Sequence, residues 1–472
     1  MTLRLHNTLT GRKEEFRPLE PGLARLYTCG PTVWNHSHVG NCRAYLMYDL
    51  LRRHLVVAGH RVHHVMNITD VDDRIIEQAA AAGTSIAELT RRYEDAFFED
   101  LRALRVREAD LYPRATGHVE EMIALIERLL EDGHAYQAGG DVYFRIASFP
   151  AYGALSHLDR GGLRPGARVA TDKYEKESAT DFALWKGVQP VDERVGAVWE
   201  ASFGRGRPGW HIECSAMAMK YLGETLDVHA GGIDLLFPHH ENEIAQSEAA
   251  TERPFARYWL HSEHLADATG AKMSKSEGNV TTLRELLAAG HDPLAVRLFL
   301  LGNAHYRQRL MLSEKALHDA AAQLRRLREL AGRVRRAEPG LRADDAALFQ
   351  TVQDARDAYR AALDDDLNLP EGLGHVFEAV REANAALDAG RVGPAAQQAL
   401  LGLLADVDAH LNVLDEEQVS LDEAVGRLIA EREEARRARD FARADRIRDE
   451  LRERGVVLED ARDGVRWKLV RR

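Results

Sequence analysis

The feature that most constrains the fold is a strand–helix–strand pattern near the start of the chain. Residues 24–29 form an apolar, strand-like run that ends in a Gly-Pro turn, and residues 61–67 form a second run of the same kind. Between them, the hydrophobic periodicity predicts an amphipathic helix from about Asn41 to Ala58, closed by Gly59. Two parallel strands joined by a helical crossover are the repeating unit of doubly wound sheets, so we predict a parallel, Rossmann-type α/β fold.

Changes in pattern along the chain predict five segments. Turn residues and a strand at 142–146 interrupt the α/β pattern, and helical periodicity dominates from residue 312 until a final helix is followed by two strand-like runs. We therefore expect the two halves of the Rossmann-type domain at 1–133 and 206–308, with an insertion at 134–205. An α-helical bundle at 309–413 and a small C-terminal α/β domain at 414–472 are expected to follow. In the final helix, Phe441, Ala444, Ile447 and Leu451 share one predicted apolar face.

Composition narrows the class of protein. The 472 residues contain only three cysteines, which excludes a disulfide scaffold and suits a reducing cytoplasm. The sequence contains neither a signal-peptide pattern nor a run of roughly 20 apolar residues, so we expect a soluble, cytoplasmic protein without a membrane partner. The net charge of −12 argues against indiscriminate nucleic-acid binding, but it leaves room for a specific RNA partner.

One cysteine lies at a spacing that indicates a metal site. Cys214 is followed 25 residues later by His239 and then by Glu243. Thiolate, imidazole and carboxylate are ligands that Zn²⁺ accepts. His239 and Glu243 are four residues apart and share one face of a helix, whereas His240 and Glu241 are expected to point elsewhere. Cys29, at the end of the first strand, is the natural fourth ligand.

Each predicted ligand, taken alone, also has a simpler explanation that involves no metal. A single cysteine is more often a small buried apolar residue than a ligand, and a His-His-Glu run can be a solvated helix start. Cys42, which has no such His/Glu cluster downstream, is interpreted in this way as core packing.

Two further motifs indicate phosphate binding. Residues 38–41, with the sequence HVGN, lie at the start of the first predicted helix, where free N–H groups and the helix dipole favour an anion. Residues 270–279, with the sequence GAKMSKSEGN, form a Gly-flanked polar loop with two lysines, Lys272 and Lys275. Their ammonium groups suit the negative charge of a triphosphate.

These motifs resemble the signature pair of class I aminoacyl-tRNA synthetases, and flanking residues resemble the cysteinyl-tRNA synthetase family in particular. The matching stretches are CGPTV at 29–33, NITDVDD at 67–73, WHIEC at 210–214 and FPHHENE at 237–243. The similarity extends from about residue 20 to 300 and returns at 440–460. It implies ATP-dependent activation of L-cysteine to cysteinyl-adenylate and transfer of cysteine to tRNA-Cys.

The resemblance also implies roles for the metal-site residues. In the family, two Cys, one His and one Glu hold the zinc, and the matching residues are Cys29, Cys214, His239 and Glu243. One zinc ion per chain would then bind the substrate thiolate and select cysteine over serine, whose hydroxyl is much harder to ionise. Trp210 is expected to wall the amino-acid pocket, and Thr69 is expected to meet the substrate.

For ATP, which is expected with Mg²⁺, we assign residues from three segments. His38 is placed at the transition-state phosphates with Gly40 and Asn41, and Lys272 and Lys275 at the leaving pyrophosphate. His229, Gly231, Gly232 and Asp234 are placed at the adenosine. The last position of the class motif is often His, so Asn41 provides a hydrogen bond there but no cationic charge.

Two alternatives stay open from the sequence. A paralogous ligase family that joins cysteine to an amino sugar-inositol shares the catalytic core and the zinc ligands, but it lacks the full C-terminal region. A zinc-dependent, non-catalytic RNA-binding regulator accounts for the metal ligands and the basic tail, but it leaves residues 272–276 without a purpose.

Overall fold

The computed structural model describes residues 2–157, 181–266, 280–337 and 346–414, together with parts of 428–469. The chain divides into two units, Met1–Leu414 and Asp415–Arg472, and each is described by itself. Among the described helices, none is long and apolar enough to cross a membrane.

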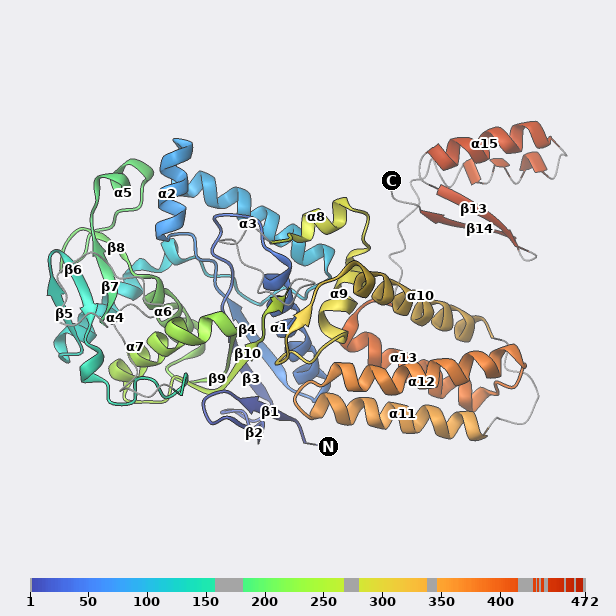
Figure 1. The fold of residues 1–472 in the computed structure, drawn as a ribbon, viewed down its shortest axis with the longest axis horizontal. Coiled ribbons are helices and arrows are strands. Elements are labelled where there is room, and N and C mark those ends of the chain that lie inside the picture. Colours follow the sequence, from blue (N-terminus) through green and yellow to red (C-terminus); the bar gives the residue numbers. More distant parts are fainter. Residues whose placement is uncertain are drawn as a thin grey trace. The chain divides into compact units, whose positions relative to one another are not determined.

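The centre of the first unit is a four-stranded parallel sheet in the order β10-β9-β3-β4 (Figure 1). Its strands are β3 (Leu23–Thr28), β4 (Arg61–Met66), β9 (Leu226–Gly232) and β10 (Ala256–Ser262). The chain proceeds from β3 toward one edge and from β9 toward the other, so the winding reverses between these two strands. Such a reversal leaves a crevice at the carboxyl ends of the strands. The predicted doubly wound α/β fold is confirmed.

Helix α1 (Val39–Val57) makes the crossover from β3 to β4. It begins two residues earlier than predicted, because His38 caps it. The His38 ring accepts a hydrogen bond from the Asn41 amide at 3.1 Å, and the Asn41 side chain accepts one from the His38 amide at 3.2 Å. The helix was expected to be amphipathic, but it is buried on nearly every side, charged residues included. It packs between the sheet and helices that come later in the chain, and these supply partners for its polar groups.

The described part of the segment between β4 and β9 contains five α-helices and a small antiparallel sheet. Its helices are α2 (Asp73–Ala82), α3 (Ile86–Ala103), α4 (Val119–Glu131), α5 (Pro190–Val195) and α6 (Trp210–Leu222). As predicted, α2 ends at Gly83, which adopts a φ of 66°. The antiparallel sheet has the order β5-β6-β7-β8 and contains β5 (Ala135–Ala138), β6 (Asp141–Phe144), β7 (Phe182–Gly187) and β8 (Gly206–Pro208). The strand expected at 142–146 stops at Phe144.

Beyond β9, α7 (Glu241–Thr251) crosses to β10, and the chain then becomes mainly helical. Short strands β11 (Leu265–Ala266) and β12 (Leu310–Met311) pair in parallel around α8 (Leu283–Ala288) and α9 (Pro293–Gly302). The helical bundle follows with α10 (Glu314–Arg336), α11 (Ala346–Asp364), α12 (Leu369–Asp388) and α13 (Pro394–Leu411). An N-terminal hairpin, β1 (Arg4–Asn7) and β2 (Arg12–Glu15), lies beside β10.

The second unit contains one described long helix and a hairpin. Helix α15 (Phe441–Glu453) is followed by β13 (Val456–Ala461) and β14 (Gly464–Leu469), which pair antiparallel. Ala444, Ile447 and Leu451 are buried as predicted, but Phe441 is 61% exposed. Phe441 is the first residue of the helix, where the apolar face has not yet met its partner.

Candidate functional site

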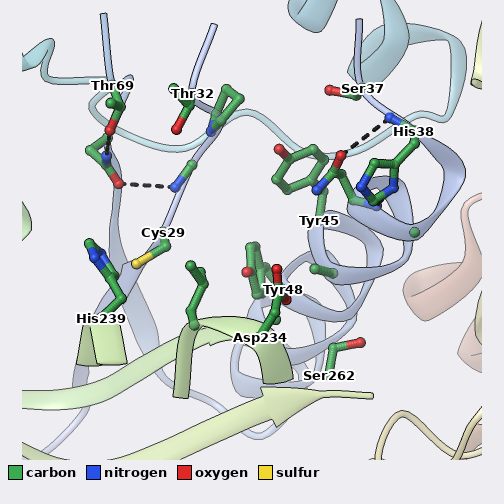
Figure 2. A pocket seen from close by; sticks show the side chains of 18 of the residues that line it. Cys29, Thr32, Ser37, His38, Tyr45, Tyr48, Thr69, Asp234, His239 and Ser262 are labelled. Atoms are coloured by element: carbon green, nitrogen blue, oxygen red, sulfur yellow. Dashed lines mark hydrogen bonds between the residues drawn. The ribbon is translucent and has the colours of Figure 1, made fainter. Parts of the chain in front are cut away.

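A cavity of about 490 Å³ opens at the carboxyl ends of β3 and β9, at the predicted crevice (Figure 2). Cys29 and His239 lie at one end of it, and His38 lies at the other, at the start of α1. The sequence-predicted residues that line this cavity are Cys29, His38, Gly40, Asn41, Thr69, Trp210, Cys214, Gly232, Asp234 and His239. Residues predicted from segments far apart in the chain therefore share one site.

The four predicted metal ligands converge at the inner end of the cavity. Cys29 follows β3, Cys214 lies on α6, His239 lies in the turn Leu236–His240, and Glu243 lies in the first turn of α7. One ligand atom from each lies within 4.8 Å of the other three. All four side chains are buried, with none more than 5% exposed. Two thiols, an imidazole and a carboxylate at such spacing match the donor set of a zinc site.

Charges at this cluster are already paired without an ion. A hydrogen bond from Cys29 lowers the pKa of the Cys214 thiol to about 6, even though burial opposes the shift. Burial would raise the pKa of Glu243, but His229 and His239 lower it to about 2. Burial would likewise lower the pKa of His239, but the Glu243 carboxylate raises it to about 10. Burial and the hydrogen bond with Cys214 raise the pKa of the Cys29 thiol. A bound dication would therefore displace protons from Cys29 and His239, whereas Cys214 and Glu243 are anionic at neutral pH.

A second set of potential ligands overlaps the first. Cys29, His229, His240 and Glu243 also lie within 4.8 Å of one another. The Nε2 atom of His240 is 3.3 Å from the Cys29 sulfur, and the Nε2 atom of His229 is 2.8 Å from a Glu243 oxygen. His240 was expected to point away from the ligands, and that expectation is wrong. The turn Leu236–His240 is not a regular α-helix, since Phe237 within it has an extended backbone, and the 3.6-residue period does not hold there.

Glu241 does point away from the cluster, as predicted. Its carboxylate accepts hydrogen bonds from the Gly153 amide at 2.7 Å and from the Ser156 amide at 2.9 Å. Glu241 thereby ties the start of α7 to the segment between β6 and β7.

Two residues assigned to the substrate lie beside the metal ligands. Trp210, the first residue of α6, stacks on the His239 ring with centroids 4.3 Å apart and is 36% exposed. Thr69 donates a hydrogen bond from Oγ1 to the Glu213 carboxylate at 2.9 Å. Both residues line the cavity, which agrees with their predicted positions.

The residues assigned to ATP divide into two groups. His38, Gly40 and Asn41 lie at the N-terminus of α1, where the helix dipole favours phosphate, and Gly232 and Asp234 line the wall that follows β9. His229 and Gly231 do not line the cavity. The His229 ring is fully buried against Glu243 and Trp259, so the structure contradicts a contact between this ring and adenosine. At Gly231, an added Cβ would lie 2.4 Å from the His240 ring, so this glycine permits close packing behind the wall.

Lys272 and Lys275 lie outside the described residues. The segments on either side of them do border the cavity. Residues 262–265 line it, and after the loop the Thr281 carbonyl accepts a hydrogen bond from the Val39 amide at 2.9 Å. Thr282 pairs with His38 in an isolated antiparallel bridge. The chain therefore enters and leaves the loop next to the His38 motif.

Several lining residues were not predicted. Tyr45, Tyr48 and Ser262 lie between the two ends of the cavity, and Ser37 lies beside His38 (Figure 2). Tyr45 and Tyr48 follow Asn41 at intervals of four and three residues, so helical periodicity from the HVGN motif was a usable signal for them. Ser262 ends β10, and the rule that parallel strands point their carboxyl ends at the ligand was a signal for it.

Family comparisons cover nearly the whole chain. The model of the class I tRNA synthetase (C) catalytic domain matches residues 15–322, the DALR domain matches 358–414, and the cysteinyl-tRNA ligase anticodon binding domain matches 419–467. The chain is 48% identical to the cysteine–tRNA ligase of Symbiobacterium thermophilum over 99% of this chain and 100% of that protein. It is 47% identical to the cysteine–tRNA ligase of Solibacter usitatus, with the same coverage.

Solved structures of lower identity share the fold. Methionyl-tRNA synthetase of Mycobacterium tuberculosis, in complex with methionyl-adenylate, aligns with a TM-score of 0.59 at 19% identity, over 83% of this chain and 89% of that one. A ternary complex of LeuRS from Agrobacterium radiobacter aligns with a TM-score of 0.60 at 13% identity, over 84% of this chain and 85% of that one.

Proposed function

Because this chain belongs to the cysteinyl-tRNA synthetase family of class I aminoacyl-tRNA synthetases, we propose that it activates L-cysteine with ATP as cysteinyl-adenylate and transfers the cysteinyl group to tRNA-Cys. The observation that carries this proposal is one cavity with a thiol-rich ligand cluster at one end and a helix N-terminus suited to phosphate at the other. Cysteine spans the two ends, with its thiol at the ligands and its carboxylate toward His38.

Zinc is the ion that the donor set fits. Cys29, Cys214, His239 and Glu243 would hold one ion per chain. When bound, zinc supplies a soft Lewis acid that stabilises a thiolate, and it favours cysteine because a serine hydroxyl is far harder to ionise. This set is preferred to the overlapping one because three of its members, Cys29, Cys214 and His239, line the cavity, whereas only Cys29 of the overlapping set does. The Trp210 ring, stacked on His239, closes one side of the thiol pocket.

At the other end, catalysis consists of positioning and charge stabilisation. The cysteine carboxylate oxygen attacks the α-phosphorus of ATP; an O–P bond forms there, and the bond to the leaving pyrophosphate breaks. His38 and the positive end of the α1 dipole face the phosphates, and the Asn41 amide holds the His38 ring in place by its hydrogen bond to that ring. Lys272 and Lys275 are assigned to the pyrophosphate, with Mg²⁺ accompanying ATP.

The adenosine is assigned to the wall after β9. Asp234 accepts hydrogen bonds from the ribose or the base, and Gly232 lets the nucleotide approach the backbone. His229 and Gly231 are reassigned to support from behind this wall. His229 orients the Glu243 carboxylate at 2.8 Å, as partners of metal ligands commonly do.

The domain division is proposed along the same lines. Residues 1–133 and 206–308 carry the catalytic site, 134–205 form an insertion, 309–413 form the helical bundle, and 414–472 contact the anticodon end of the tRNA. The match of 419–467 to an anticodon binding domain supports the last assignment. Because its proposed acceptor, tRNA-Cys, is used in translation, we assign the protein to the cytoplasm.

The direct test of activation is cysteine-dependent exchange of pyrophosphate into ATP. Zinc-loaded protein should catalyse the exchange with L-cysteine and not with L-serine. If no exchange occurs with cysteine, activation of this amino acid is wrong. Equal exchange with serine would remove thiol selection from the mechanism.

A second test separates the two possible acceptors. Supplying tRNA-Cys and the amino sugar-inositol acceptor side by side with labelled cysteine should place the label on the tRNA. Transfer to the amino sugar would support the paralogous ligase reading instead. The anticodon binding domain match favours the tRNA.

A further inference from the structure

We propose that Glu213 is a positioning residue, which fixes the Thr69 hydroxyl as a hydrogen-bond acceptor for the ammonium group of the amino-acid substrate. This inference rests on the proposed activation of cysteine. It explains how the enzyme would distinguish cysteine from a carboxylic acid that carries a thiol but no amine. It is carried by a chain of hydrogen bonds beside the metal ligands.

The chain of hydrogen bonds begins at the turn after β3. The Gly30 amide donates to the Asn67 side-chain oxygen at 3.0 Å, which orients that amide group. The Asn67 nitrogen then donates to Thr69 Oγ1 at 3.2 Å. Thr69 Oγ1 donates its own proton to Glu213 Oε2 at 2.9 Å. Gly30 permits this close approach, since a Cβ there would lie 1.8 Å from the Asn67 carbonyl oxygen.

These contacts leave the Thr69 hydroxyl able to form one more hydrogen bond, as an acceptor. A hydroxyl has one proton and two lone pairs. Glu213 takes the proton and Asn67 occupies one lone pair, so the remaining lone pair accepts a hydrogen bond and the group has nothing left to donate. An ammonium group is a donor only, and it matches this hydroxyl; a carboxylate does not.

The position of Thr69 fits the ammonium of a substrate whose thiol lies at the metal ligands. Thr69 and Asn67 line the cavity, and Glu213 immediately precedes Cys214 in α6. In cysteine the ammonium and the thiol are carried by adjacent carbons, so a group that binds the ammonium must lie near the metal centre. Figure 2 shows Thr69 on the same side of the cavity as Cys29 and His239, away from His38.

Glu213 has no other hydrogen-bond partner to account for its burial. Its side chain is 1% exposed, and its Oε1 atom is buried without a partner among the described residues. Burial, together with the nearby Cys214, raises the pKa of Glu213. With a proton on the unpartnered Oε1, the Oε2 oxygen is still an acceptor for the Thr69 hydroxyl. Its one hydrogen bond is to Thr69, so we assign Glu213 the role of orienting the Thr69 hydroxyl.

The test compares cysteine with 3-mercaptopropionate, which has the same thiol and carboxylate but no amine. In pyrophosphate exchange, Glu213→Leu should raise the KM for cysteine about tenfold, as expected for a lost hydrogen bond to a charged group. The KM for ATP and the inhibition constant of 3-mercaptopropionate should stay unchanged. Glu213→Gln can still accept from Thr69 through its amide oxygen and should restore the cysteine KM.

A second variant keeps the proposal testable if Glu213→Leu loses zinc or does not fold. Thr69→Val removes the hydroxyl and leaves Glu213 in place, so it should show the same selective loss. The double variant should be no worse than Thr69→Val alone, because both substitutions remove one interaction. Equal weakening of cysteine and 3-mercaptopropionate, or no change with either variant, would overturn the proposal. Absence of exchange in the unsubstituted enzyme is a separate result, which rejects cysteine activation itself.

Discussion

The thiols of Cys42 and Cys214 are both buried, but their pKa values are shifted in opposite directions. Cys42 lies in α1, where burial raises the pKa of its thiol. The pKa of Cys214 is instead lowered to about 6, chiefly by the hydrogen bond from Cys29. A thiol that ionises readily beside an imidazole and a carboxylate is suited to bind a metal, and one in an apolar core is not.

We therefore predict that Cys214→Ser loses bound zinc and cysteine-dependent pyrophosphate exchange together. The matched control is Cys42→Ala, which should keep both, because Cys42 is not a predicted ligand. Metal content by inductively coupled plasma mass spectrometry and the exchange rate are the two measurements. Exchange that persists in zinc-free Cys214→Ser would remove the metal from the mechanism.

His410 makes stability depend on pH. It lies buried between α1 and the bundle, with its ring 3.1 Å from His54 Nδ1 and from the Tyr359 hydroxyl. Burial lowers the pKa of His410 to about 4, from about 6.5 in the unfolded chain. Between these values the unfolded state binds a proton that the folded state does not. The contribution of neutral His410 to the free energy of unfolding is therefore fully present above pH 6.5. About 3 kcal/mol of this stability is lost as the pH falls to 4.

Chemical denaturation at several pH values checks this prediction. His410→Gln should be less stable than the unsubstituted protein at pH 7.5 but should lose less stability between pH 6.5 and 4. The comparison with the variant is needed because other buried histidines, such as His64 with a pKa lowered to about 3, act in the same direction. Identical pH profiles for the two proteins would contradict the assignment.

At the scale of elements, helices α1 and α9 are joined through a buried ion pair. Arg297 on α9 donates to Asp49 on α1 at 2.5 Å, and both side chains are fully buried. The same guanidinium also donates to the backbone carbonyls of Leu104 and Leu411. One charged side chain thus connects the helix that carries the His38 motif to the segment after α3 and to the end of the bundle.

We predict that Arg297→Leu lowers the free energy of unfolding by roughly 3 kcal/mol, because it leaves a buried carboxylate and several carbonyls without this partner. The control is Lys315→Gln, which breaks the exposed Lys315–Asp319 pair and should change stability by less than about 0.5 kcal/mol. Thermal and urea unfolding measure both. A loss of stability as small as that of the control would mean that the Arg297–Asp49 ion pair contributes little to the free energy of unfolding.

At the scale of the whole molecule, the chain has two units, to which we assign separate tasks. The first ends at Leu414 and contains the entire cavity, and the second contains the region that matches an anticodon binding domain. Counted from the sequence, residues 425–472 carry 15 Lys and Arg against 11 Asp and Glu, whereas residues 415–424 of the same unit carry five acidic residues and no basic one. This local positive charge suits contact with an RNA backbone.

Deleting residues 415–472 should therefore leave pyrophosphate exchange unchanged and lower kcat/KM for aminoacylation of tRNA-Cys by roughly a hundredfold, the equivalent of about 2.7 kcal/mol of binding. Both reactions are measured on the same preparation. If exchange falls in parallel with aminoacylation, the second unit supports the fold of the first instead of contacting tRNA.

Local patterns in the sequence were enough to predict the parts of the protein that depend on near neighbours. The strand–helix–strand unit and the end of α2 at Gly83 follow from periodicity and backbone preference. The metal ligand set and the assignment of His38 and Asp234 remain predictions. The residues named for them line one cavity, except Glu243, whose ligand atom lies within 4.8 Å of the other three ligand atoms.

Packing decided what these patterns cannot encode. His240 meets Cys29 because the turn before α7 departs from helical geometry, and His229 is buried behind the wall it was expected to line. The pairing of Thr69 with Glu213 joins residues 144 positions apart, and no local signal predicts it. The sequence by itself determined which residue types and secondary structures are present. Only the tertiary structure decided which polar groups face the cavity and which serve as their buried partners, because burial leaves each polar group to find whichever partner the fold brings within reach.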